Sequence, residues 1–157
     1  MIINGAHNRS LSFELFAFEE QPKGFHPEDN WIEIDFHLKD EKKSWHVTCA
    51  FLTAAEVIEL AQWLDDIGNR HEVKRDLYFL EPNISFHLMY DYGKTKLILI
   101  TLNAELRPEW HIEDREYTVL GHVGNRQLTQ IAYSLKEQLM NLYIKAGCVQ
   151  IEMPFKV

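Results

Sequence analysis

Two apolar runs of this chain meet at Glu81-Pro82-Asn83, where an unbroken strand cannot continue. Proline has no backbone N–H to donate to a sheet ladder, and asparagine is a favoured turn residue. The pattern therefore predicts a strand over 76–81, a tight corner, and a second strand over 83–91. We expect Phe79 and Phe86, which lie on either side of the corner, to contribute to the core.

Alternating apolar and polar side chains predict further strands in the first third of the chain. The cleanest alternation runs over 30–38, which indicates a half-buried strand with a polar outer face. A looser one runs over 11–20, and a hairpin partner is expected over 45–51 after the charged turn at 39–43. The polar face of the 30–38 strand carries Trp31, Glu33, Asp35 and His37.

Two helices are predicted, and both have recognisable ends. Thr53 and Glu56 form a capping box, in which each side chain reaches the other's backbone N–H, and Gly68-Asn69 ends this helix. A second helix is predicted from Asn125 to Gly147, with one apolar stripe.

The remaining segments complete an α+β fold. A strand is expected over 95–106, a short one around 116–120, and an edge strand over 149–157, while 121–124 is expected to lead flexibly into the second helix. Short connections favour antiparallel pairing, and each helix needs a sheet to cover its apolar stripe. We therefore predict a mainly antiparallel β-sheet of about seven strands, as one sheet or two adjoining sheets, with two packed α-helices.

Length and cysteine content bound the class of protein. At 157 residues the chain suits one domain spanning 1–157. Cys49 and Cys148 lack metal-ligand spacing, which indicates reduced thiols in a cytoplasmic protein. The first residues do not resemble a signal peptide, and no apolar run approaches the roughly 20 residues of a membrane helix. The sequence does not indicate an oligomeric state.

Acidic residues outnumber basic ones by 24 to 16, which gives a formal net charge of −8. Nine of the acidic residues but three of the basic ones lie within the first 41 positions. A field of this sign attracts basic partners and repels nucleic acid and anionic membranes. The alternative is a solvated surface whose charge keeps the protein soluble. We therefore expect a basic protein partner, without direct nucleic-acid or membrane binding.

Two groups of polar residues are candidate metal-binding or acid–base sites. Glu33, Asp35 and His37 share one strand face, and His46 can lie on the facing hairpin strand, so that a divalent metal or shared protons are conceivable. Positions i, i+2 and i+4 span too far to reach one ion, and a solvated sheet face is expected instead. The segment 105–111 gathers acid, base and imidazole at a strand end, but a structural turn is expected there. We predict no catalytic residue, no metal ligand and no cofactor.

A partner surface is predicted around Trp31. A large aromatic ring among carboxylates suits an interface anchor, with charges that steer a partner and a ring that becomes buried. The alternative is that Trp31 tucks under the 21–27 loop. The predicted partner-binding residues are Glu28, Asp29, Trp31, Glu33 and Asp35.

Four motifs occur together in a recognisable order. They are Asp29-Asn30-Trp31-Ile32-x-Ile34, Ala61-Gln62-Trp63-Leu64, Phe79-x-Glu81-Pro82-Asn83-Ile84-x-Phe86 and Glu105-x-x-Pro108. Over roughly residues 10–142 the chain resembles the WapI-type immunity proteins and their uncharacterised bacterial relatives. The sequence departs from that pattern after Leu142 and in the loop before Asp29.

The resemblance implies a cytosolic antidote that binds and blocks the toxic C-terminal domain of a polymorphic toxin, a tRNA-cleaving nuclease in the namesake case. Such toxins are commonly basic, which suits the charge of this chain. The motif residues look like scaffold and identify no toxin-binding surface. The residues themselves leave two other functions open. One is a module that binds a small molecule or peptide in an aromatic-rich pocket. The other is an enzyme, which a tight cluster of His, Asp and Glu with a shifted pKa would favour.

Overall fold

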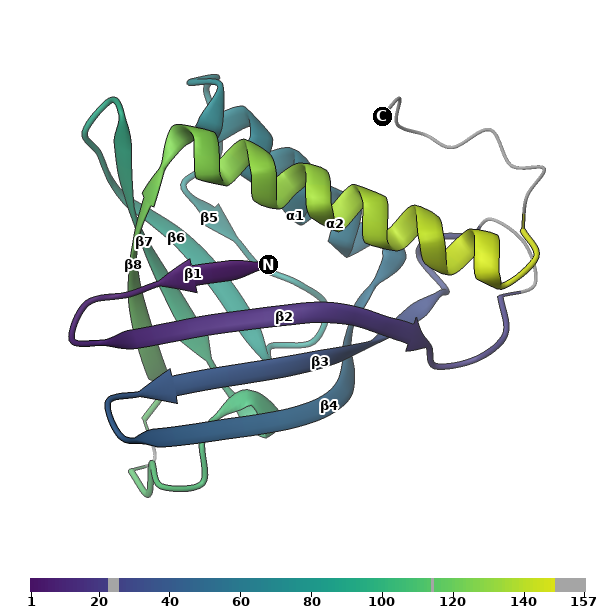
Figure 1. Ribbon diagram of the computed structural model, residues 1–157, viewed down its shortest axis with the longest axis horizontal. Helices are drawn as coiled ribbons and strands as arrows, with labels where there is room; N and C mark the ends of the chain where they lie inside the picture. The colour runs from purple at the N-terminus through teal and green to yellow at the C-terminus, as the bar shows by residue number, and fades with distance from the viewer. Residues whose placement is uncertain (23–25, 114, 149–157) are drawn as a thin grey trace.

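A computed structural model describes residues 1–22, 26–113 and 115–148 of the chain. It contains two four-stranded sheets in which all the paired strands are antiparallel (Figure 1). The first sheet has the order β1-β2-β3-β4. Its strands are β1 (Ile2–Asn4), β2 (Arg9–Phe18), β3 (Trp31–Asp40) and β4 (Lys43–Thr53).

The second sheet has the order β5-β6-β7-β8. Its strands are β5 (Asp76–Leu77), β6 (Ile84–Asp91), β7 (Thr95–Leu102) and β8 (Tyr117–Gly124). The helices are α1 (Ala54–Gly68) and α2 (Asn125–Lys145), with a short 3₁₀ helix, η1 (Ala104–Leu106), after β7. The predicted α+β class with two adjoining sheets and two helices is confirmed. The edge strand expected over 149–157 lies outside the described residues.

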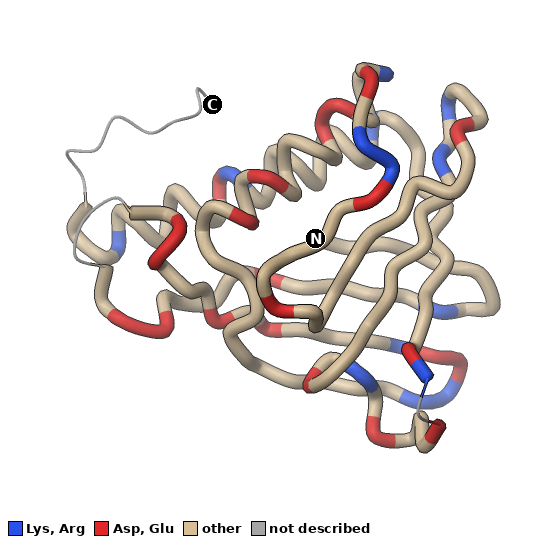
Figure 2. Tube along the Cα trace, turned by 180° about the vertical axis from the view of Figure 1, so that it is seen from behind, with Lys and Arg blue, Asp and Glu red and all other residues tan. Residues whose placement is uncertain are grey.

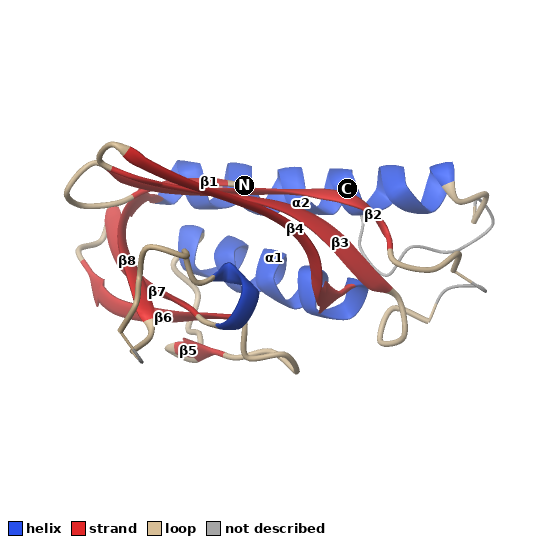
Figure 3. Cartoon of the chain, turned by 90° about the horizontal axis from the view of Figure 1, so that it is seen from below, coloured by secondary structure: helices blue, strands red, loops and turns tan. Residues whose placement is uncertain are grey.

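The core forms between the sheets and the two helices, which lie side by side (Figures 1 and 3). Alternation places the inner side chains of β2 and β3 in this core, while one stripe of each helix packs against it. The capping box is confirmed, because Thr53 accepts from the Glu56 backbone N–H and its own N–H donates to the Glu56 carboxylate at 2.8 Å. These contacts fix where β4 ends and α1 begins.

The two sheets meet where β1 approaches β8. Gly5 and Gly121 form an isolated antiparallel bridge, and the Ala6 N–H donates to the Leu120 carbonyl at 3.0 Å. A Cβ on Gly121 would lie 2.6 Å from the Ile3 side chain, so that glycine is required for this approach. The expectation that 121–124 is a flexible lead-in to α2 is therefore wrong, since these residues continue β8 and pair with β7.

The corner at Glu81-Pro82-Asn83 exists, but the strand before it is shorter than predicted. β5 ends at Leu77, and the side chains of Tyr78 and Leu80 are 70% and 74% exposed. The Leu80 N–H donates to the carboxylate of Glu56 in α1 at 2.6 Å, which draws this segment away from β6. The predicted strand over 76–81 is therefore wrong beyond Leu77.

The strand predicted over 95–106 also ends early, and its continuation supports the corner. β7 stops at Leu102, and η1 follows. The Asn103 N–H donates to the Asn83 carbonyl at 2.8 Å, and the buried Asn83 amide donates to the Glu105 carboxylate at 2.6 Å. These bonds satisfy polar groups that burial would otherwise leave unpaired.

Candidate functional site

The five predicted partner-binding residues lie just before β3 and along its first half. Glu28 and Asp29 are exposed just before β3. Trp31, Glu33 and Asp35 then occupy the outer face of β3 and are half-buried, while the alternate residues of the strand are buried in the core. The alternation that predicted a half-buried strand therefore also presents these three side chains on its outer side.

A hollow lies where β2 ends and β3 begins. Its lining consists of Glu19, Glu20, Gln21, His26, Asp29, Asn30 and Trp31. The Glu19 N–H donates to the Trp31 carbonyl at 3.0 Å and holds the two strand ends together. Figure 2 shows acidic segments along this end of the molecule. We call the carboxylates of Glu19, Glu20 and Asp29 in this hollow the acidic rim.

Sequence reasoning missed Glu19 and Glu20 as members of this group. Both are exposed and follow directly after β2, in a segment read as the end of a strand. The hairpin-like return of the chain from β2 to β3 brings them beside Asp29. The one signal available in the sequence was their place in the acid-rich first quarter of the chain.

Asn30 anchors the floor of the hollow to both helices. Its carbonyl accepts from the Ala54 N–H at the start of α1 at 2.8 Å, and its amide donates to the Tyr143 hydroxyl of α2 at 2.9 Å. Trp31 is half-buried in the same hollow, with Gln21 and His26 of the connecting loop beside it. Trp31 thus follows directly after a residue that is bonded to both helices.

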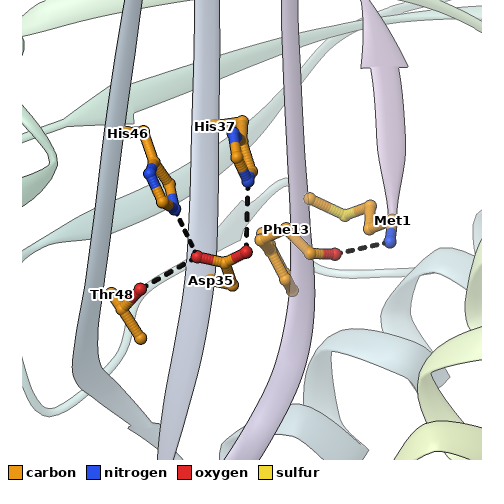
Figure 4. Close-up of polar contacts among 6 residues, drawn as sticks. All are labelled: Met1, Phe13, Asp35, His37, His46 and Thr48. Carbon is orange, nitrogen blue, oxygen red and sulfur yellow. Dashed lines mark hydrogen bonds and ion pairs between the residues drawn. The ribbon is translucent and has the colours of Figure 1, made fainter.

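Three side chains on the outer face of the first sheet converge on one carboxylate (Figure 4). Nε2 of His37 lies 3.1 Å from one Asp35 oxygen, and Nε2 of His46 lies 2.5 Å from the other. The Thr48 hydroxyl donates to that second oxygen at 2.9 Å. The two imidazole rings stack with centroids 4.1 Å apart and planes 8° from parallel. We call Asp35, His37, His46 and Thr48 the imidazole cluster.

The residues in this cluster differ from the candidate group in the sequence analysis. His46 on β4 is the register partner of His37 on β3, and Thr48 is the partner of Asp35, whereas Glu33 lies outside the group. The i, i+2, i+4 argument therefore does not apply, because one member comes from the neighbouring strand.

Hydrogen bonding keeps Asp35 ionised. The bonds from His46 and then Thr48 lower the pKa of Asp35 to about 2, against a smaller opposing effect of burial. A carboxylate with so low a pKa is a poor general acid and a weak base near neutral pH. The direction of this shift is opposite to that of a carboxyl group that serves as a general acid.

The other candidate residues do not assemble into a site. His46 and Cys49 face opposite sides of β4, since Cys49 pairs with Ile34 on the inner side. Burial, and to a lesser degree Glu105, raises the pKa of the Cys49 thiol, which disfavours a reactive thiolate. His111 bonds to the Arg115 carbonyl at 2.9 Å, consistent with a structural turn after Glu105.

A second hollow lies between α1 and the segment 72–78. Apolar side chains form part of its lining, and charged residues of both signs surround them. Its apolar lining includes Ile58, Trp63, Val73, Leu77 and Tyr78. Trp63 is buried there and donates to the Lys74 carbonyl at 2.8 Å.

Residues from three of the four motifs that carry the family resemblance form scaffold contacts. Trp63 of α1 lies 6.1 Å from the Phe86 ring of β6, and Phe79 lies 6.2 Å from Phe86 in an edge-to-face arrangement. Asn83, from the same motif as Phe79 and Phe86, donates to the carboxylate of Glu105 from the last motif. Among the described residues, neither helix combines the length and apolar character needed to cross a bilayer.

Comparison with known proteins places the chain. The family model described as the immunity protein WapI-like family matches residues 1–142, which extends the resemblance to β1 and ends where the sequence departs from the pattern. No curated protein and no solved structure gives a significant match. The match covers most of the chain, so this protein belongs to the WapI-like immunity protein family.

Proposed function

We propose that this protein is a cytoplasmic antidote that binds a cognate bacterial toxin domain and blocks it without catalysing a reaction. The proposed contact surface comprises Glu28, Asp29, Trp31, Glu33 and Asp35, extended by Glu19 and Glu20. The observation that carries the proposal is the hollow in which the acidic rim surrounds Trp31. An aromatic anchor beside exposed charges of one sign is the combination that protein interfaces use.

Each part of this surface has its own physical task. Exposed carboxylates raise the encounter rate with a basic partner, because their field acts over about a Debye length of 8–10 Å. A tryptophan ring contributes mainly to the lifetime of the complex, since its apolar area is buried on binding. Asp35 is already bonded to His37, His46 and Thr48, so we assign the steering role chiefly to the acidic rim and Glu28.

The proposed partner is a basic toxin domain, such as a nuclease. A nuclease that holds a phosphate backbone needs a groove lined by Lys and Arg. Carboxylates on a rigid strand start can occupy that groove in place of phosphates. The β3–β4 hairpin at the other end of the first sheet suits this task less, because it carries both signs of charge. Its charged residues are Lys39, Asp40, Glu41, Lys42 and Lys43.

The test compares two double charge reversals that change the net charge equally. Glu19→Lys with Asp29→Lys alters the acidic rim, and Asp65→Lys with Glu137→Lys alters solvent-accessible positions on α1 and α2 outside both hollows. Both raise the formal net charge from −8 to −4. The probe is the purified C-terminal domain of the toxin encoded beside this gene, with association followed by surface plasmon resonance at several salt concentrations.

The acidic-rim variant should associate at least tenfold more slowly at low salt and show a flatter salt response, because steering depends on local charge. The helix variant should retain most of the wild-type rate. Equal losses in both variants would show that net charge alone matters and that the hollow is not the contact surface. Protection of cells that express the toxin domain should follow the same order.

A second candidate function is binding of a peptide or small molecule in the hollow between α1 and 72–78. Its apolar lining, including the buried Trp63 and the exposed Tyr78, is the specific observation that favours it. Tyr78→Ala separates the two candidates, since it removes an exposed ring from that hollow and leaves the acidic rim intact. Peptide or small-molecule binding that Tyr78→Ala abolishes, together with wild-type toxin neutralisation by the acidic-rim variant, would favour the second candidate.

A further inference from the structure

The imidazole cluster has the composition of a metal site. One carboxylate oxygen and two imidazole nitrogens, from Asp35, His37 and His46, all lie within 4.8 Å of one another. Two of these side chains come from one strand at i and i+2, and the third is the direct register partner of His37 on β4. This triangular placement brings three ligand atoms together at one point of a flat sheet face, which a single strand cannot do.

We propose that Asp35, His37 and His46 bind one divalent transition-metal ion, of which Zn²⁺ fits best, with a remaining coordination position open to solvent. Imidazole nitrogen and carboxylate oxygen bind Zn²⁺ at about 2.0–2.2 Å, so tetrahedral neighbours lie roughly 3.4 Å apart. The 3.1 Å and 2.5 Å separations join Nε2 of His37 and Nε2 of His46 to different Asp35 oxygens, and the two ring planes are 8° from parallel. To bind one ion, both imidazole rings must therefore turn so that their Nε2 atoms point at one position beside the Asp35 carboxylate.

The present contacts show what the ion would replace. Each Nε2 now faces a carboxylate oxygen, a contact in which a proton lies between two electronegative atoms. A cation bound to both nitrogens and to the carboxylate takes the place of those protons. The side chains of His37 and His46 are 52% and 56% exposed, so their Nδ1 atoms can be solvated when Nε2 carries the metal.

The surroundings of the cluster support cation binding. Thr48 donates to Asp35 at 2.9 Å and so fixes the carboxylate, as hydrogen-bonding neighbours of metal ligands do. Glu14 is the register partner of Asp35 on β2 and adds negative charge on the same face.

The ligand set also selects the kind of ion. Two imidazoles favour zinc and its transition-metal neighbours, whereas Mg²⁺ and Ca²⁺ prefer oxygen ligands alone. The inference goes beyond the proposed function and does not depend on it, because the metal is offered to the protein without any toxin. A failed metal titration would leave the charge-reversal experiment above unaffected.

The chain contains a matched control for this site. His87 on β6 lies 2.5 Å from Asp76 on β5, also as a cross-strand register pair, and both side chains are substantially exposed. This pair has the same His–Asp contact as the cluster but belongs to no group of three ligands within residues 1–22, 26–113 and 115–148. His87→Gln therefore removes an exposed imidazole without touching the proposed site.

The experiment is isothermal titration calorimetry of the untagged full-length protein with ZnCl₂, compared with MgCl₂. Wild type should bind one zinc ion at this site, and His37→Gln and His46→Gln should each weaken that binding at least tenfold. Thr48→Val should weaken it by roughly 10–100-fold through the loss of the bond to Asp35. His87→Gln should bind like wild type, and Co²⁺ should give the absorption bands of a tetrahedral site in wild type but not in His46→Gln.

Several results would overturn the proposal. They are no zinc binding by wild type, equal binding by the cluster variants, an equal loss in His87→Gln, or Mg²⁺ binding as tight as that of Zn²⁺. Glutamine keeps the size and polarity of histidine at these exposed positions. A thermal melt with zinc gives a second readout, since the ion should raise the unfolding temperature of wild type more than that of His37→Gln.

Discussion

The hydroxyl of Tyr117 in β8 donates a hydrogen bond to the carboxylate of Asp40 at the end of β3, and this bond joins the two sheets. Nε of Arg9 in β2 lies 3.2 Å from the other Asp40 oxygen, and the guanidinium lies 5.2 Å from the centre of the Tyr117 ring. Tyr117 is buried, and the Asp40 side chain is 17% exposed. A charge-assisted bond in such surroundings is stronger than one at the surface.

Removal of the Tyr117 hydroxyl should destabilise the fold. Tyr117→Phe leaves the ring in the core but removes the donor to a charged acceptor, a loss of roughly 1.5–3 kcal/mol. Chemical denaturation measures the free energy of unfolding. Tyr133→Phe is the control, because Tyr133 is 53% exposed on α2 and its substitution should change stability by less than about 0.5 kcal/mol. Equal effects of the two substitutions would show that the bond between the sheets contributes nothing.

The same contact predicts how stability depends on pH. Burial by itself raises the pKa of Asp40, but the hydrogen bond from Tyr117 and the ion pair with Arg9 outweigh it and hold the pKa below the ordinary value of 3.8. Because the pKa is lower in the folded state, Asp40 contributes stability above pH 3.8, and this contribution is lost as the pH falls through the folded-state pKa.

Asp40→Asn should therefore reduce the slope of stability against pH below about pH 4 and leave the slope near neutral pH unchanged. The measurement is the free energy of unfolding between pH 2 and pH 7 for wild type and variant. Asp29→Asn is the control, since Asp29 is exposed and lies outside this contact. If the slopes of wild type and Asp40→Asn coincide, the hydrogen bonds do not stabilise the ionised carboxylate.

Features that depend on neighbouring residues could be predicted from the sequence. Thr53 and Glu56 are three residues apart, so their capping box and the start of α1 followed from local chemistry. The alternation of β3 gave the correct inner face, because burial repeats every two residues in a strand. Phe86 was placed correctly in the core for the same reason.

Features that depend on distant contacts were missed. Gly121 read as a flexible residue because its need for a small side chain comes from Ile3, at the other end of the chain. The residues after Leu77 were predicted to be a strand, because the hydrogen bond from the Leu80 N–H to Glu56 cannot be inferred from neighbouring residues. The imidazole cluster needed the register of His37 with His46, which local alternation does not fix.

Phe86 is predicted to be a major stabilising residue of the second sheet. It is 1% exposed and contacts both Trp63 and Phe79. Phe86→Ala should reduce the free energy of unfolding by roughly 3–5 kcal/mol, because it removes buried area and leaves a cavity. Phe16→Ala is the control, since Phe16 is 64% exposed. A denaturation midpoint of Phe86→Ala equal to that of wild type would contradict its place in the core.

The last prediction concerns Trp31 and the proposed partner. If its ring anchors the toxin domain, Trp31→Ala should leave the association rate nearly unchanged and speed dissociation by about tenfold or more, as expected for a contact contributing about 2 kcal/mol. The acidic-rim variant should show the opposite division, with slower association and a smaller change in dissociation. Surface plasmon resonance with the toxin domain measures both rates.

The control for Trp31→Ala is Tyr133→Ala, which removes an exposed aromatic ring from α2 and should alter neither rate. Circular dichroism must show that both variants fold, because Trp31 is half-buried at the start of β3. Wild-type dissociation of a folded Trp31→Ala variant would remove the anchor from the proposed surface. Electrostatic steering of the toxin domain by Glu19, Glu20 and Asp29 would then need a different apolar contact to hold the complex. Phe16 is the next residue to substitute, because it is exposed on the neighbouring strand β2.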